Sequence, residues 1–140
     1  MSAGPGQVLF EFVRHWSRRT TPDVAEQGRL VQATEAAYSV IRRGPATING
    51  VAHELGIDQS GASRLVKDAV AAGYLELRAA DADGRRRHVT ITAAGLELLD
   101  QAHAWQEEVF TRLTADWSER RRTEFRRAML SLLQRSNPPD

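Results

Sequence analysis

The stretch "DADGRRRHVTIT", residues 81–92, sets three consecutive arginines beside an Asp-Gly turn signal. A planar guanidinium forms paired hydrogen bonds to a phosphate or to the edge of a guanine, which a lysine cannot do. The alternating residues before and after the turn predict a β-hairpin with its tip at residues 81–87. The pattern is typical of a projection that contacts an anionic polymer, and a solvated charge run is its ordinary alternative.

A second polar group lies upstream, in "DQSGASRLVK", residues 58–67. Its apolar residues recur at helical spacing, and Asp58 is a suitable N-cap. Residues at the open end and on the opposite face have groups that can bond base edges or phosphates in a major groove. We predict DNA contacts at Gln59, Ser60, Gly61, Ser63, Arg64 and Lys67.

The three arginines at the hairpin tip cannot share one role if the strand is regular. Alternation points Arg85 and Arg87 to one side and Arg86 to the other. An arginine at the tip can enter a narrow minor groove, and another can bind a flanking phosphate. We therefore predict DNA contacts at Arg85 and Arg86, with Arg87 as a third candidate whose alternative is a place elsewhere in the strand.

Helical and strand signals place these groups within a larger set of elements. Residues 1–6 are expected to be disordered before a helix from Gln7, and a second helix begins after an N-cap at Thr21. A short helix spans about residues 49–55 with Asn49 as its N-cap, and the helix that follows ends at Gly73. Thr92 caps a long helix that is expected to reach Trp117, and a last helix begins near Ser118.

The expected fold is mainly α with a small β-hairpin: a winged helix-turn-helix flanked by dimerisation helices. The flanking helices have more apolar surface than a winged unit of about 50 residues can bury, which predicts a homodimer. The expected parts are a disordered start (1–6), N-terminal helices for dimerisation and support (7–44), the winged DNA-binding unit (45–92), C-terminal dimerisation helices (93–135) and a disordered tail (136–140).

The order of these motifs resembles the MarR family of bacterial transcription regulators. The resemblance covers about residues 7–135 and is most specific in "TINGVAHELGIDQSGASRLVKDAVAAGYLELRAADADGRRRHVTITAAG", residues 47–95. Gly50 and Gly61 depart from the family pattern, because larger residues are usual near the starts of these two helices. The resemblance implies a dimeric regulator, most simply a repressor, with two recognition helices on a pseudopalindromic double-stranded DNA operator.

The resemblance also implies an effector pocket between the dimerisation helices and the winged unit. An aromatic or phenolic small molecule is the expected effector, and core or dimer-interface packing is the alternative role of the same side chains. The candidate effector-binding residues are His15, Trp16, Tyr38, His103 and Trp105. Peroxide sensing through a thiol, which some relatives use, is excluded because the chain has no cysteine.

Charge, residue spacing and hydropathy reduce the number of functions that the protein could have. A net charge of +1 and a pI of 8.3 mean that DNA binding must depend on where the charge lies. No two histidines stand three or four residues apart, and no nucleophile–base pair or phosphate loop is evident, so neither a metal site, a cofactor nor an enzyme is expected. With no signal peptide and no apolar run of membrane length, a cytoplasmic location without a membrane partner is expected. The alternative function is a winged-helix protein–protein interaction module without DNA binding.

Overall fold

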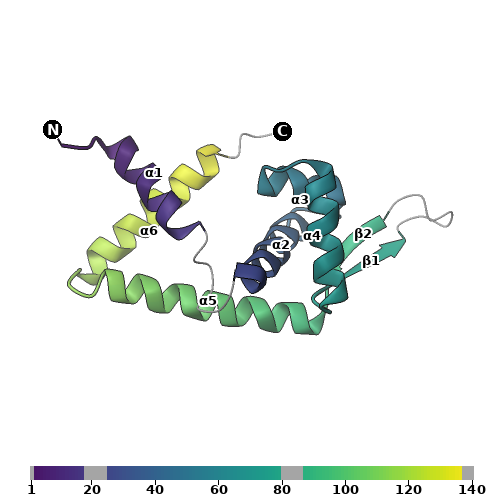
Figure 1. Cartoon of the computed structure of the whole chain (residues 1–140). Helices are drawn as coiled ribbons and strands as arrows, with labels where there is room; N and C mark the ends of the chain where they lie inside the picture. The colour runs from purple at the N-terminus through teal and green to yellow at the C-terminus, as the bar shows by residue number, and fades with distance from the viewer. Residues whose placement is uncertain (1, 18–24, 80–86, 137–140) are drawn as a thin grey trace. The chain divides into compact units, whose positions relative to one another are not determined.

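A computed structural model describes residues 2–17, 25–79 and 87–136, with side chains from residue 28 onward in the second range. Within them, six helices and one two-stranded hairpin follow one another in the order of Figure 1. Their bounds are α1 Pro5–Trp16, α2 Ala25–Ile41, α3 Ile48–Leu55, α4 Gln59–Ala71, β1 Leu75–Ala79, β2 Arg87–Ile91, α5 Ala93–Leu113 and α6 Glu119–Ser136. The chain forms two compact units, residues 1–106 and 107–140, which are described separately.

The first unit contains the predicted winged helix-turn-helix, and this fold is confirmed. Figure 1 shows α2, α3 and α4 gathered against one another, with the hairpin leading away from the end of α4. Strands β1 and β2 are antiparallel, and Leu77 faces Val89 across the pair. The core of the unit lies between α2, α3, α4 and the hairpin; its members exposed by 1% or less include Ala33, Ala37, Ala46, Val51, Val66, Ala69, Leu75 and Val89.

The N-cap of α3 is Thr47, so the prediction of Asn49 was wrong. Thr47 has an extended backbone, and its hydroxyl oxygen accepts a hydrogen bond of 3.0 Å from the Gly50 N–H. Asn49 is the second residue of α3, so it lies inside the helix rather than at the flanking cap position. The expected end of this helix is confirmed, because Gly56 has a φ of +68° in the left-handed region that glycine favours.

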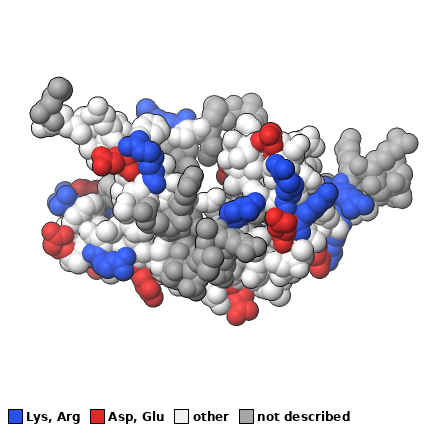
Figure 2. All heavy atoms as spheres, viewed as in Figure 1, with Lys and Arg blue, Asp and Glu red and all other residues white. Residues whose placement is uncertain are grey.

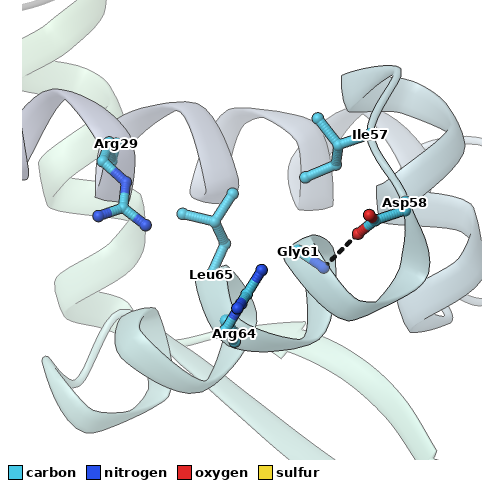
Figure 3. Close-up of a pocket in the computed structure, with 6 residues that line it drawn as sticks. All are labelled: Arg29, Ile57, Asp58, Gly61, Arg64 and Leu65. Carbon is cyan, nitrogen blue, oxygen red and sulfur yellow. Dashed lines mark hydrogen bonds between the residues drawn. The ribbon is translucent and has the colours of Figure 1, made fainter.

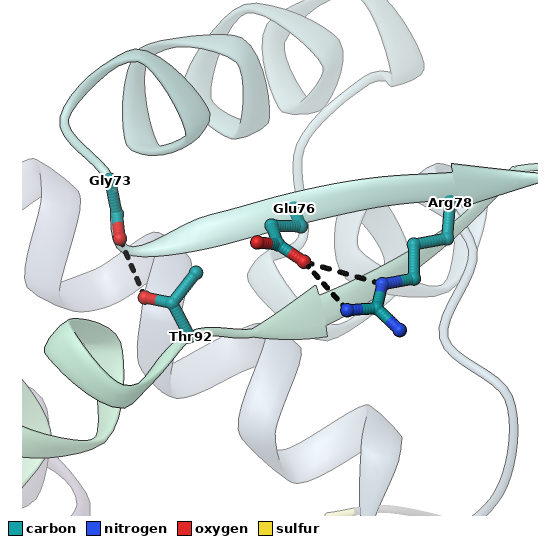
Figure 4. A network of polar contacts seen from close by, with 4 residues as sticks. All are labelled: Gly73, Glu76, Arg78 and Thr92. Atoms are coloured by element: carbon teal, nitrogen blue, oxygen red, sulfur yellow. Dashed lines mark hydrogen bonds and ion pairs between the residues drawn. The ribbon is translucent and has the colours of Figure 1, made fainter.

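Figure 4 shows a hydrogen bond that joins the end of α4 to the start of α5. The Thr92 hydroxyl donates to the Gly73 carbonyl at 2.6 Å and accepts from the Gly95 N–H at 3.0 Å, which confirms Thr92 as the cap of α5. Gly95 packs so closely here that a Cβ would overlap the Tyr74 carbonyl oxygen. The contact between the end of α4 and the start of α5 therefore requires a residue without a Cβ at position 95.

The second unit contains the last residues of α5 and all of α6. α5 ends at Leu113 rather than at the expected Trp117. The Thr114 carbonyl accepts from the Trp117 N–H at 2.9 Å, which closes a tighter turn, and from the Arg122 guanidinium, the shorter bond at 2.7 Å. Ser118 caps α6 by accepting from the Arg121 N–H at 3.1 Å. Phe125 then packs edge-on against Trp117, with ring centroids 5.3 Å apart.

Helix α1 begins two residues before the expected Gln7. Gly4 precedes it with an extended backbone, its N–H donates to the Gln7 Oε1 at 3.0 Å, and Pro5 occupies the first helical position. Proline suits that position because its missing N–H would have no partner inside the helix. Pro5 and Gly6, which were expected to be disordered, are therefore helical. In the described parts of the chain, no helix is long and apolar enough to cross a membrane.

Candidate nucleic-acid interface

Helix α4 separates an apolar face from a polar one. Ala62, Val66 and Ala69 are buried against the core. Of the residues predicted to contact DNA from this helix, Gly61 and Ser63 are partly buried, and the exposed members are Gln59, Ser60, Arg64 and Lys67. The structure therefore brings the exposed members of the set to one side of one helix, as the helical spacing predicted.

The first turn of α4 is held by Asp58. Its carboxylate accepts a hydrogen bond of 2.6 Å from the Gly61 N–H, which confirms the predicted N-cap. A Cβ at Gly61 would lie 3.0 Å from that carboxylate oxygen, closer than such contacts usually are. Glycine at this position therefore leaves the cap undisturbed, which gives a physical reason for this departure from the family pattern.

A cavity of about 480 Å³ opens between α2 and the start of α4. Figure 3 shows Arg29 of α2 and Arg64 of α4 on either side of Leu65, with the Asp58–Gly61 hydrogen bond at the far end. Arg29 is exposed and was not among the predicted site residues. An arginine on a supporting helix has no local sequence signal, since its place beside α4 depends on how the two helices pack.

The hairpin contributes one of its three arginines to the described structure. Arg87 begins β2 opposite Ala79 and is exposed, on the face that also holds the buried Val89. Arg85 and Arg86 lie outside the described residues. On the other face, Figure 4 shows the Arg78 guanidinium paired with the Glu76 carboxylate at 3.1 Å, so these two charges neutralise each other.

The charge on the viewed surface is mixed. Figure 2 shows basic side chains gathered over the part that holds α4 and the strands, with acidic groups interspersed. This distribution agrees with a net charge of +1, since the attraction for a polyanion would come from a local group of cations.

The residues predicted to bind an effector divide into three groups by their contacts. The Trp16 ring packs edge-on against His15 and against Trp105, with centroids 5.1 and 6.3 Å away. His103 Nε2 lies 2.6 Å from Glu35 Oε1, and Tyr38 lies under the Arg42 guanidinium. These contacts do not decide whether the five residues bind an effector, which stays a prediction.

A cavity of about 250 Å³ lies instead between α2, α3 and α5 within the first unit. None of the five predicted effector residues lines it, although its Glu35 contacts His103. Its lining has two carboxylates, of which Glu54 pairs with the exposed Arg43 at 2.6 Å. The lining residues are Val31, Gln32, Glu35, Ala36, Ser39, Glu54, Leu55 and Gln106. Over the described part of the chain, no cluster of histidine and carboxylate side chains could hold a metal ion.

Comparison with known proteins agrees with this geometry. The sequence model of the MarR family matches residues 27–86, which include most of α2, the helix-turn-helix and β1. No curated protein matches the chain in sequence. The resemblance to this family that the sequence suggested is confirmed over the winged unit.

Solved structures extend the likeness to the whole chain. A mutant MepR from a multidrug-resistant S. aureus isolate has a TM-score of 0.75 and 14% identity, over 98% of this chain and 100% of that one. A mutant MarR from E. coli has a TM-score of 0.71 and 16% identity, over 95% and 98%. The S. aureus MepR–DNA complex has a TM-score of 0.65 and 16% identity, over 96% and 100%.

At these identities the solved structures establish the fold, and the family model establishes the kinship of the winged unit. The sequence model therefore relates the winged unit, rather than the whole chain, to the MarR family of transcription regulators.

Proposed function

We propose that this protein is a homodimeric, sequence-specific DNA-binding repressor whose recognition helix is α4. The observation that carries the proposal is the exposed polar face of α4, where Gln59, Ser60 and Arg64 follow a capped first turn. Amide, hydroxyl and guanidinium groups are the donors and acceptors that read base edges in the major groove. The likeness of the fold to that of MepR, which has been solved on DNA, supports this role for α4.

The hairpin is proposed as the second contact, with Arg85, Arg86 and Arg87 as its basic residues. Arg87 begins β2 and is exposed, so its guanidinium is available to a phosphate. Contacts from a wing add affinity by neutralising phosphates, while contacts from the helix select the sequence.

The proposed dimer would join copies through the terminal helices. In α1, Phe10 is 64% exposed, and in α6, Leu133 is 59% exposed, although both helices have apolar stripes. A self-complementary pairing would cover both faces and place two recognition helices about one turn of DNA apart, roughly 34–36 Å. Such a protein binds a pseudopalindromic operator.

An effector site is proposed at the cavity between α2, α3 and α5. Its carboxylates, Glu35 and Glu54, favour a ligand that donates hydrogen bonds or carries positive charge. This ligand differs from the aromatic or phenolic effector that the sequence predicted, because the Glu35 carboxylate would repel an anion while Glu54 already pairs with Arg43. Trp16 and Trp105, whose rings contact each other, keep a packing role in this proposal.

The proposal is tested by fluorescence anisotropy on a duplex selected from a random DNA pool. Arg64→Ala should weaken binding to the selected duplex by about 1–3 kcal/mol for each half-site and affect random DNA less, because each subunit then lacks one hydrogen-bonded pair with a base. Arg112→Ala is the matched control, since Arg112 is exposed at the end of α5 and its replacement removes the same charge. No binding at low salt would point to a protein-interaction module instead, and equal affinity of the unchanged protein for selected and random DNA would overturn the sequence-specific role.

A further inference from the structure

The cavity beside α4 combines groups from two helices with different roles. α2 contributes Arg29, and α4 contributes Arg64 and Leu65. Figure 3 shows both arginine side chains extending toward the same space, in which Leu65 lies between them. A supporting helix thus places a cation next to the helix that we propose reads the DNA.

The positive charge of this cavity is not balanced by its own acid. Asp58 is the one carboxylate in the described lining, and its oxygen is bonded to the Gly61 N–H at 2.6 Å. Among the described residues, no ion pair or hydrogen bond joins Arg29 or Arg64 to an acidic group. Two guanidinium groups therefore face one open cavity, at whose far end a single carboxylate is engaged in capping α4.

The shape of the cavity suits the long stems of its arginines. Leu65 and Ile57 provide apolar contact, and Ile57 is 40% exposed. Arginine places its methylene groups along such surfaces while its guanidinium remains in water, where a fork of N–H donors can bind two oxygens of one phosphate. The anion that fits this arrangement is a phosphodiester approaching from the open side of the cavity.

We propose that Arg29 is a DNA-backbone contact, so that the supporting helix α2 forms part of the DNA interface. This inference rests on the proposed function, because it assigns a phosphate of the DNA that α4 reads. Arg29 lies outside the recognition helix, so it binds the backbone and fixes the depth and angle at which α4 enters the groove. Contacts of this kind position a protein without selecting a sequence.

The first test compares Arg29→Ala with Arg112→Ala, which removes the same charge from the end of α5. Arg29→Ala should weaken binding about tenfold for each half-site, on selected and random duplexes alike, because each subunit then lacks a charge-assisted hydrogen bond to a phosphate. The slope of log affinity against log salt should fall by about 0.9 for each phosphate that is no longer neutralised, or about 1.8 for a dimer. Arg112→Ala should leave both quantities unchanged.

The second test identifies the phosphate by making single linkages neutral with methylphosphonate. At one position in each half-site, the effects of the neutral linkage and of Arg29→Ala should not add, because each removes the same interaction. Arg29→Lys should recover most of the salt slope and less of the affinity, since it keeps the charge but not the planar fork of donors.

The outcomes separate this inference from the function on which it rests. Sequence-specific binding that Arg29→Ala leaves unchanged overturns the Arg29 contact and leaves the function intact. A loss of affinity confined to the selected duplex, or additive effects at every linkage, also overturns it, because the residue would then act on sequence or on folding. If the unchanged protein binds no DNA, both proposals fail.

Discussion

Within the winged unit, Val51, Val66 and Leu75 are at most 1% exposed, whereas α1 and α6 contain no buried residue. The difference is not one of composition, because both terminal helices have apolar side chains at helical spacing. Those side chains include Val8, Leu9, Phe10, Phe12 and Val13 in α1, and Phe125, Met129, Leu130, Leu132 and Leu133 in α6, each between 39% and 64% exposed.

This contrast separates two kinds of stability. The winged unit buries its apolar groups against residues of the same chain, so its folding is a property of one copy. An apolar face that its own chain leaves exposed favours association with another molecule. If two copies pair through α1 and α6, the stability of these helices depends on protein concentration. The proposed functions divide in the same way. The winged unit would bind the DNA sequence, and α1 and α6 would set the distance between the two recognition helices of a dimer.

The largest expected effect comes from leucine truncations in the two regions. Leu75→Ala should lower the free energy of unfolding by about 2–5 kcal/mol at any protein concentration, because it opens a cavity in the core. Leu133→Ala, at a side chain 59% exposed in the single chain, should lower it most at high protein concentration and less on dilution, because separated copies no longer have the contact that the truncation removes. Urea denaturation at several concentrations measures both.

A matched control for this pair is Leu96→Ala, at a side chain 47% exposed in α5. It removes the same atoms, and its effect should be small and independent of concentration. If Leu133→Ala behaves like this control, α6 takes no part in a dimer, and the stability of the terminal helices does not differ in kind from that of the winged unit. Sedimentation of the unchanged protein should show twice the mass of 15.6 kDa.

Two glycines test the same contrast at the level of the backbone. Gly95→Ala should destabilise the protein by about 1–3 kcal/mol, because the added Cβ meets the Tyr74 carbonyl, which is backbone and cannot rotate away. Gly6→Ala in α1 has nothing within 4 Å of its Cβ and should be neutral or stabilising by about 0.5–1 kcal/mol, since alanine favours a helix. Thermal unfolding followed by circular dichroism measures the pair, and equal effects would mean that the joint between β1 and α5 tolerates an extra atom.

The order of the elements could be predicted from local signals. Asp58, Gly73 and Thr92 mark helix ends through chemistry within a few residues, so their roles in the winged unit were predicted correctly. The polar face of α4 followed from helical spacing alone. Such features depend on the chain close by, which a sequence displays directly.

Features that depend on tertiary packing were missed. Arg29 lies beside α4 only because α2 packs there, and the Thr114 carbonyl after α5 accepts from the Arg122 guanidinium, eight residues further along the chain. In the same way, the contact between Trp16 and Trp105 and the place of Glu35 in a cavity follow from how the helices pack. Local spacing contains no signal for such partners.

The smallest expected effect concerns the cap of α3, where two candidates stand two residues apart. Thr47→Ala should cost about 1 kcal/mol of stability, because the Gly50 N–H is then without the hydroxyl that accepts its hydrogen bond at 3.0 Å. Asn49→Ala should change stability by less than about 0.5 kcal/mol, or raise it slightly, since alanine is the better residue inside a helix. Urea denaturation measures the free energy of unfolding of both variants. A larger destabilisation by Asn49→Ala would mean that Asn49, and not Thr47, is the cap of α3. The helix α3 packs against α4. If Thr47→Ala also weakens DNA binding, the recognition helix α4 depends on the hydroxyl that caps α3.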